Sequence, residues 1–247
     1  MNTMIRSTLG LAAVFLISVA VQAADLSAGA LSIGKAEGDV TYSLPDSKNF
    51  MAAAAGTALP QGAILKTGAN STASVVFSSG SVAIVKENSI VEVSKFLQEP
   101  FFGTMTAGEE PSVSDTELKV QQGEVLSVVA KLRKGSRYTV SSPVGAAGVR
   151  GTTFLFSYNQ VTKTGRLVVT EGSVVLIFGD RQVTVEAGFS YRFPGGERVP
   201  NTPDDLLRTI EDIRLYGPGA ATSGFTPVGP QSGPTVPNID LIGVSVN

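Results

Sequence analysis

Short apolar runs, each opened by a glycine, recur along most of the chain. β-Branched and aromatic residues dominate these runs, and Gly, Asn, Asp or Pro separates them. This pattern is typical of β-strands joined by turns in which glycine adopts a backbone conformation that other residues resist. The sequence therefore predicts an all-β body from about residue 30 to residue 194. The glycines that open the runs are Gly38, Gly62, Gly80, Gly123, Gly135, Gly151, Gly172 and Gly188.

The spacing of these glycines is too uneven for a repeat of fixed period. It suits short strands stacked in successive coils, or a sandwich, and the pattern alone leaves both open. The run from Val174 to Phe178 is apolar at every position. We therefore expect some strands to be buried on both faces.

One segment, residues 98–116, interrupts the pattern. It contains prolines, glycines and acidic residues without periodicity, so the sequence predicts a long loop there. Phe101 and Phe102 are two adjacent, large apolar residues within it. Two alternatives stay open: the two rings fold back onto the sheet, or they present an apolar patch to a partner.

A single helix is predicted over residues 202–216. Thr202 and Pro203 are a capping hydroxyl and a first-turn proline, and Gly217 ends the helix. We expect this amphipathic helix to cap an open end of the β body and cover its exposed edges, with partner binding as the alternative. Its predicted apolar stripe consists of Leu206, Leu207, Ile210, Ile213 and Leu215.

The first 23 residues have the features of a secretory signal peptide. Arg6 lies before an apolar run of about 13 residues, which is shorter than the roughly 20 needed to span a bilayer. Val21-Gln22-Ala23 fits the small-residue cleavage rule, so we expect cleavage after Ala23. The predicted location is periplasmic or secreted. An uncleaved anchor is the alternative, and no later segment is apolar enough to span a membrane.

Charge and composition narrow the function. Without Arg6 the mature chain has 18 basic and 21 acidic side chains, a net charge of −3, which gives no reason to expect nucleic-acid binding. The chain contains no Cys and no His. These absences exclude Ser-His-Asp and Cys-His catalysis, ordinary zinc sites and haem ligation. We expect no metal and no cofactor.

Beyond the helix, residues 217–238 contain 10 Gly or Pro residues and no charge, a composition typical of a linker. An apolar, strand-like tail follows at residues 239–247. We expect this tail to add a strand either to the chain's own β body or to a partner.

Several motifs occur together in a recognisable order. They are Leu59–Gly68 (LPQGAILKTG), Ala73–Val82 (ASVVFSSGSV), Val120–Leu126 (VQQGEVL), Tyr138–Pro143 (YTVSSP) and Val149–Phe154 (VRGTTF). Val168–Val174 (VVTEGSV) and Val185–Gly188 (VEAG) complete the set. In this order and spacing the chain resembles the FecR-domain family over roughly residues 35–192. The resemblance implies a solenoid-like stack of short twisted strands, which we assign to residues 24–196.

The resemblance also implies an envelope compartment and protein interaction. Iron-transport regulators of this family relay a signal from an outer-membrane receptor, and a cytoplasmic anti-sigma segment and one membrane span precede their domain. Here an export signal precedes the β body. We therefore expect no transmission across the inner membrane by this chain alone, and the resemblance does not imply iron regulation.

Arg150 is the most conspicuous charge, because it lies among glycines and small residues. As an architectural residue it would bond loop carbonyls or pair with a carboxylate such as Glu171 or Glu124. As a functional residue it would clamp an anion or a peptide carboxylate, with Gly151 allowing close approach and Thr152 and Thr153 as hydrogen-bond donors.

The acidic residues form no recognisable catalytic pair. Glu109-Glu110 and Asp204-Asp205 have evident solvated or capping roles, whereas glycoside hydrolysis needs two carboxylates flanking the scissile bond. The sequence thus predicts a non-enzymatic envelope protein that binds or senses an envelope protein or a polysaccharide. The alternatives are a carbohydrate-active enzyme on a β-solenoid scaffold, or a periplasmic sensor acting with a separately encoded membrane regulator.

Overall fold

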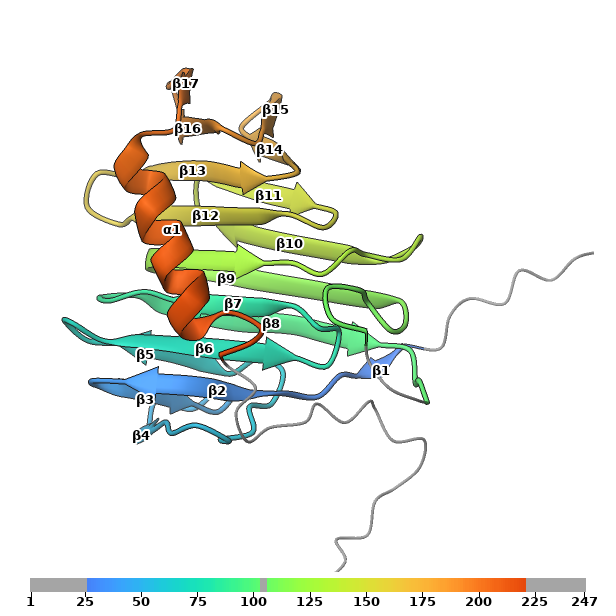
Figure 1. The fold of residues 1–247 in the computed structure, drawn as a ribbon. Coiled ribbons are helices and arrows are strands. Elements are labelled where there is room, and N and C mark those ends of the chain that lie inside the picture. Colours follow the sequence, from blue (N-terminus) through green and yellow to red (C-terminus); the bar gives the residue numbers. More distant parts are fainter. Residues whose placement is uncertain (1–25, 103–105, 221–247) are drawn as a thin grey trace, which may run out of the picture.

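The computed structural model describes residues 26–102 and 106–220. The predicted signal peptide, most of the linker and the tail lie outside these residues. The described chain is a stack of short strands in two layers, with one C-terminal helix (Figure 1). The predicted all-β, solenoid-like class with a single C-terminal helix is confirmed. The sheet is open rather than closed into a barrel.

The chain alternates between the layers as it climbs the stack. The first layer contains β1 (Ser27–Ala28), β3 (Val40–Ser43), β4 (Phe50–Ala52), β5 (Ile64–Thr67), β8 (Ile90–Gln98), β10 (Arg137–Ser142), β11 (Gly145–Val149), β14 (Ser173–Phe178) and β15 (Arg181–Glu186). The second contains β2 (Leu31–Glu37), β6 (Thr72–Phe77), β7 (Val82–Val85), β12 (Thr153–Asn159), β13 (Thr164–Glu171), β16 (Phe189–Phe193) and β17 (Arg198–Pro200). The strand β9 (Ser114–Val128) belongs to both.

The order of strands within each layer follows the pairing partners. In the first layer the order runs β4, β3, β5, β8, β9, β10, β11, β14, β15, and β1 pairs with the end of β8. In the second layer the order is β2, β6, β7, β9, β12, β13, β16, β17. All of these pairs are antiparallel except the parallel pair of β9 and β10. The stack is thus coil-like in its path and sandwich-like in its two layers.

The layer changes occur at tight corners that contain glycine. All eight glycines that open the predicted strands have positive φ. At the corner within β9, Gly123 has φ +87°, and a Cβ added there would lie 2.5 Å from the Cα of Ser89. Such a contact is too short for any other residue, so Gly123 allows β9 to pass from one layer into the other.

The second layer is buried on both faces. Val75, Phe77 and Val85 face the main core between the layers, whereas the alternate residues Val76 and Ile84 pack on the opposite face under the helix. This alternation follows from the two-residue period of a strand. Burial on both faces therefore occurs in β6, β7 and the end of β9. It does not occur in Val174–Phe178, where Ile177 is 48% exposed.

The helix α1 (Pro203–Tyr216) begins as predicted. Thr202 is the N-cap and its hydroxyl accepts a hydrogen bond from the Asp205 amide, while the Asp205 carboxylate bonds the Thr202 amide in return. The prediction that α1 caps an open end of the stack is wrong. The helix crosses the outer face of the second layer, from the β16–β17 end toward β6 (Figure 1).

Only part of the predicted apolar stripe faces the sheet, because Ile213 and Leu215 pack against it whereas Leu206, Leu207 and Ile210 are exposed. Leu207 and Ile210 are 66% and 64% exposed, whereas Thr209, Asp212 and Tyr216 are buried. Charged side chains on the sheet explain this orientation of the helix. Arg166 on β13 makes two 2.8 Å bonds to the Asp205 carboxylate, Lys86 pairs with Asp212, and the Tyr216 hydroxyl bonds Glu37. Because these ion pairs lie on one side of α1, Leu206, Leu207 and Ile210 are left facing solvent.

The predicted loop at 98–116 is shorter than expected. Gln98 ends β8 and Ser114 begins β9, and these two residues pair with each other. The segment between β8 and β9 is therefore 99–113. Gln98 and Ser114 are polar but buried, and Gln98 accepts a 2.6 Å hydrogen bond from Ser78. No helix among the described residues is long and apolar enough to cross a membrane.

The ion pair of Arg166 and Asp205 predicts a pH-dependent stability. The hydrogen bonds from Arg166 hold the pKa of Asp205 well below its ordinary value. Asp205→Asn should lower the free energy of unfolding at pH 7 by about 1–3 kcal/mol. This penalty should shrink as the pH falls below about 4, because the unfolded wild-type chain then takes up a proton that the folded chain refuses. Urea denaturation at pH 7 and pH 3 measures both values.

Asp204→Asn is the matched control, since Asp204 is exposed in the same helical turn. It should change stability by less than about 0.5 kcal/mol. A penalty for Asp205→Asn that stays constant or grows on acidification would show that the ion pair does not hold α1 to the sheet.

Candidate functional site

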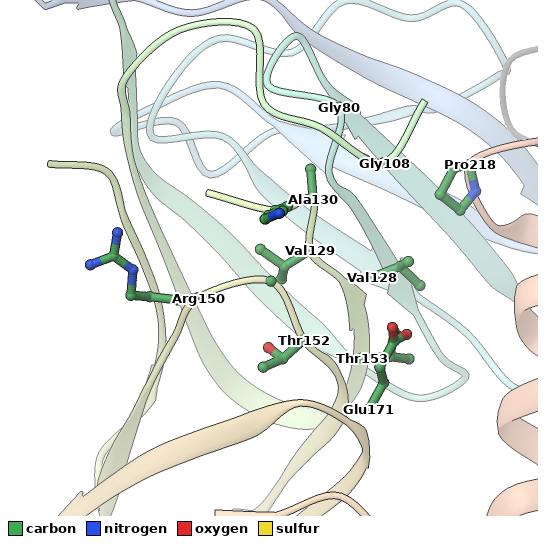
Figure 2. Close-up of a pocket in the computed structure, with 12 residues that line it drawn as sticks. Gly80, Gly108, Val128, Val129, Ala130, Arg150, Thr152, Thr153, Glu171 and Pro218 are labelled. Carbon is green, nitrogen blue, oxygen red and sulfur yellow. The ribbon is translucent and has the colours of Figure 1, made fainter. Parts of the chain in front are cut away.

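One cavity lies where several strand ends meet. Its volume is about 460 Å³, and its walls are formed by the end of β9, the connection between β11 and β12, and the end of β13. Gly80, Gly108 and Pro218 complete the lining (Figure 2). The cavity thus combines residues that are far apart in the sequence, and Arg150, Gly151, Thr152 and Thr153 all line it.

Arg150 makes one contact through its guanidinium group. Its Nη2 donates a 3.2 Å hydrogen bond to the carbonyl oxygen of Arg133, and the side chain is otherwise exposed. Of the two architectural alternatives, the structure shows the carbonyl contact. Glu171 instead accepts a hydrogen bond from Thr153, and Glu124 lies near α1. In Figure 2 the side chain of Arg150 points away from the other lining residues. Its charged group is therefore exposed but directed away from the cavity.

Gly151 and Thr152 fasten this loop to the end of β9. Gly151 has φ +70°, and a Cβ added there would lie 3.2 Å from the Cα of Lys131. The Thr152 carbonyl accepts a 2.9 Å hydrogen bond from the Val129 amide. A Cβ added at Gly172 would lie 2.7 Å from the Thr152 methyl group. This part of the motif is therefore architectural, because its close packing requires small residues.

The two threonines differ in their hydrogen bonds. The Thr153 hydroxyl donates to Glu171 at 3.3 Å. The Thr152 hydroxyl is buried and has no partner among the described residues. Neither hydroxyl is an exposed donor, so the structure presents both residues as parts of the cavity wall.

The aromatic pair lies apart from the cavity lining. Phe102 is 92% exposed and Phe101 is half-buried. The loop that carries them nevertheless contributes to the cavity, because the carbonyl of Gly108 accepts a 2.9 Å hydrogen bond from the Lys131 amide. Of the two alternatives for the pair, the structure favours the second for Phe102, whose exposed ring can contact a partner.

Glu110 anchors this loop, a role that the sequence did not reveal. The expectation of a solvated Glu109-Glu110 pair is wrong for Glu110, which is 2% exposed. Its carboxylate accepts hydrogen bonds from the Ser136 hydroxyl at 2.6 Å, the Arg133 amide at 2.7 Å and the Ser114 hydroxyl. Two adjacent glutamates in an irregular segment carry no signal that one of them is buried.

A second group of charges, also unpredicted, lies between α1 and the second layer. Glu124, Arg166, Asp205, Arg208 and Asp212 surround a small pocket there. Burial raises the pKa of Glu124, and Arg208 lies 3.9 Å from it. This group holds the helix in place. The cavity at Gly151–Thr153 is the candidate binding site because the residues of the sequence motif line it.

The partnerless hydroxyl of Thr152 gives a stability prediction. Thr152→Val keeps the shape of the side chain and removes a buried polar atom that has no bond to lose. It should leave the melting temperature unchanged or raise it slightly. Thr67→Val is the control, because the Thr67 hydroxyl donates to the Lys86 carbonyl at 2.5 Å and accepts from the Ser89 amide at 3.0 Å.

The control should cost about 1–3 kcal/mol, since it leaves buried backbone groups without partners. Differential scanning calorimetry of both variants compares the two sites. Equal losses in the two variants would mean that the Thr152 hydroxyl has a partner in the folded protein.

Comparisons with known proteins address the fold and the family. Residues 63–175 match the family model described as "FecR protein". No curated protein matches the sequence. Two crystal structures of a "putative anti-sigma factor" from Parabacteroides distasonis ATCC 8503 are similar, both with a TM-score of 0.43. The match to the first structure has 14% identity and covers 59% of this chain and 62% of that chain. The match to the second has 13% identity and covers 62% of this chain and 74% of that chain. The chain therefore spans less than two thirds of the first structure's length.

Proposed function

We propose, from the FecR domain that this chain carries over residues 63–175, that it is an exported, non-enzymatic sensing module that binds a protein of the cell envelope. A membrane regulator encoded separately is one such partner. The observation that carries this proposal is the open cavity formed by the FecR motif at Gly151–Thr153 together with the loop 99–113.

The chemistry of the cavity suits binding. Small residues and backbone form its walls, so an extended segment of a partner can approach closely. Lys131 in its lining is an exposed cation and Glu171 is an exposed carboxylate, and the exposed guanidinium group of Arg150 lies beside the cavity. Charged groups of both signs give orientation and specificity to a protein partner.

Phe102 adds an apolar contact. Its ring is 92% exposed, and the loop that carries it also forms part of the cavity wall. Exposed aromatic side chains are frequent anchors in protein interfaces. Phe102 is therefore a second candidate contact, outside the cavity lining.

The enzyme alternative has less support from the same geometry. Glu171 is the one carboxylate among the residues that line the cavity in the described part of the chain. Glycoside hydrolysis uses two carboxylates placed on either side of the bond that is cleaved. The lining of the cavity thus supplies one of the two carboxylates that this reaction uses.

Site-specific photocrosslinking in intact cells tests this function. A benzophenone amino acid replaces Arg150, Phe102 or, as the control, Thr184, which is exposed on β15 at one end of the stack. We expect one protein adduct from positions 150 and 102 and none from position 184. The crosslinked chain should begin at Ala24, because export removes residues 1–23.

Two results would contradict the proposal. Adducts of equal yield from position 184 would show that capture does not depend on the cavity. An adduct that resists proteinase and contains sugar would assign the site to a polysaccharide instead.

A further inference from the structure

The two ends of the first layer differ in how their edge strands are protected. At one end β15 includes Arg181 and Glu186, and both are exposed. Charged side chains on an edge strand discourage pairing with other strands. At the other end β4 consists of Phe50, Met51 and Ala52, all exposed and none charged. The β4 edge therefore lacks the protection that the β15 edge has.

No described segment covers the β4 edge. Among the described strands, β4 pairs only with β3. The neighbouring edge of the second layer, β2, is covered by the segment 56–59: the Ile33 amide bonds the Thr57 carbonyl at 2.8 Å, and the Leu59 amide bonds the Leu31 carbonyl at 3.0 Å. At the same end of the stack, one edge is thus covered and the other is open.

The open edge is also an apolar patch. Phe50 is 44% exposed and Met51 42%, and Leu44 just beyond β3 is 44% exposed. Exposed apolar residues grouped on an edge strand mark a surface that another strand covers.

The chain leaves the described body at this same end. The carbonyl of Leu215 accepts a hydrogen bond from Lys35 on β2 at 3.4 Å, and the Tyr216 hydroxyl bonds Glu37 on the same strand. The end of the helix lies over β6 (Figure 1) and contacts side chains of the neighbouring β2, the end strand of the second layer. Ala220, the last described residue, follows four residues after Tyr216.

The segment 239–246, Ile-Asp-Leu-Ile-Gly-Val-Ser-Val, has the composition of a strand. Residues 221–238 connect it to the described body and carry no charge. An uncharged linker of this length has a root-mean-square span of about 21–25 Å, enough to reach a neighbouring edge. Tethering on this scale gives an effective concentration of the order of millimolar, which favours pairing within the chain over pairing with a second copy.

We propose that residues 239–246 add a strand to β4 and cover the open edge of the first layer. The added strand bonds the β4 backbone groups that point away from β3, and its apolar side chains cover Phe50 and Met51. The tail is then a part of the fold that protects the chain from edge-to-edge association.

Hydrogen exchange tests this pairing in the full mature chain. We expect Ile242→Asp with Val244→Asp to speed exchange in a peptide covering residues 50–55 by at least tenfold. A peptide covering β15 should not change. Thr235→Asp with Val236→Asp is the matched control, because it adds the same charge within the linker, and it should leave both peptides as in the wild type.

A disulfide experiment distinguishes the occupants, since the chain contains no native cysteine. Met51→Cys combined with Ile242→Cys, Val244→Cys or Val246→Cys should form a disulfide within one chain. Disulfides only between chains would assign the edge to a second copy. Unchanged exchange at residues 50–55 in the double Asp variant would overturn the proposal.

Discussion

The described stack depends on β9, which is the one strand among the described residues that both layers share. Its first part pairs with β8 and β10 in the first layer, and its last part pairs with β7 and β12 in the second. The change of layer occurs at Gly123, where the backbone passes so close to Ser89 that no side chain fits. The Ser89 hydroxyl then accepts a 2.9 Å hydrogen bond from the Glu124 amide. The same arrangement recurs at Gly38, where the Ser71 hydroxyl accepts a 2.8 Å bond from the Asp39 amide.

The candidate site and the helix both depend on this shared strand. The end of β9 forms one wall of the cavity at Gly151–Thr153, and the loop that precedes β9 forms another. Leu126 on the opposite face of β9 packs under α1, and Glu124 lies among the charges that position that helix. One strand thus connects the FecR motif, the loop with Phe102 and the C-terminal helix.

Local chemistry in the sequence was enough to predict part of this structure. The eight strand-opening glycines have positive φ, and Thr202 caps the helix, because both features are determined within a few residues. Two asparagines of positive φ, Asn70 and Asn88, each precede a corner serine. An asparagine followed by a serine is therefore a second sequence signal for these corners, in addition to the glycines.

The rest required contacts between distant residues. The face that α1 turns to the sheet depends on Arg166, which lies 39 residues from its partner Asp205, and on Lys86, which lies 126 residues from its partner Asp212. The burial of Glu110 depends on Ser136, and the single contact of Arg150 depends on the carbonyl of Arg133. The hydrophobic pattern gave only part of the face that α1 turns to the sheet. Ile213 and Leu215 pack there, but the ion pairs of Asp205 and Asp212 share that face and leave Leu207 and Ile210 exposed.

The corner within β9 can be tested with two glycines that have the same backbone conformation. Gly123 and Gly188 have φ of +87° and +88°, but a Cβ at Gly188 would have no neighbour within 4 Å. Gly188→Ala should therefore cost only the conformational penalty of about 1–2 kcal/mol. Gly123→Ala should cost at least about 2 kcal/mol more, measured by urea denaturation, because its Cβ meets the backbone of Ser89. Equal losses in the two variants would contradict the central role of this corner.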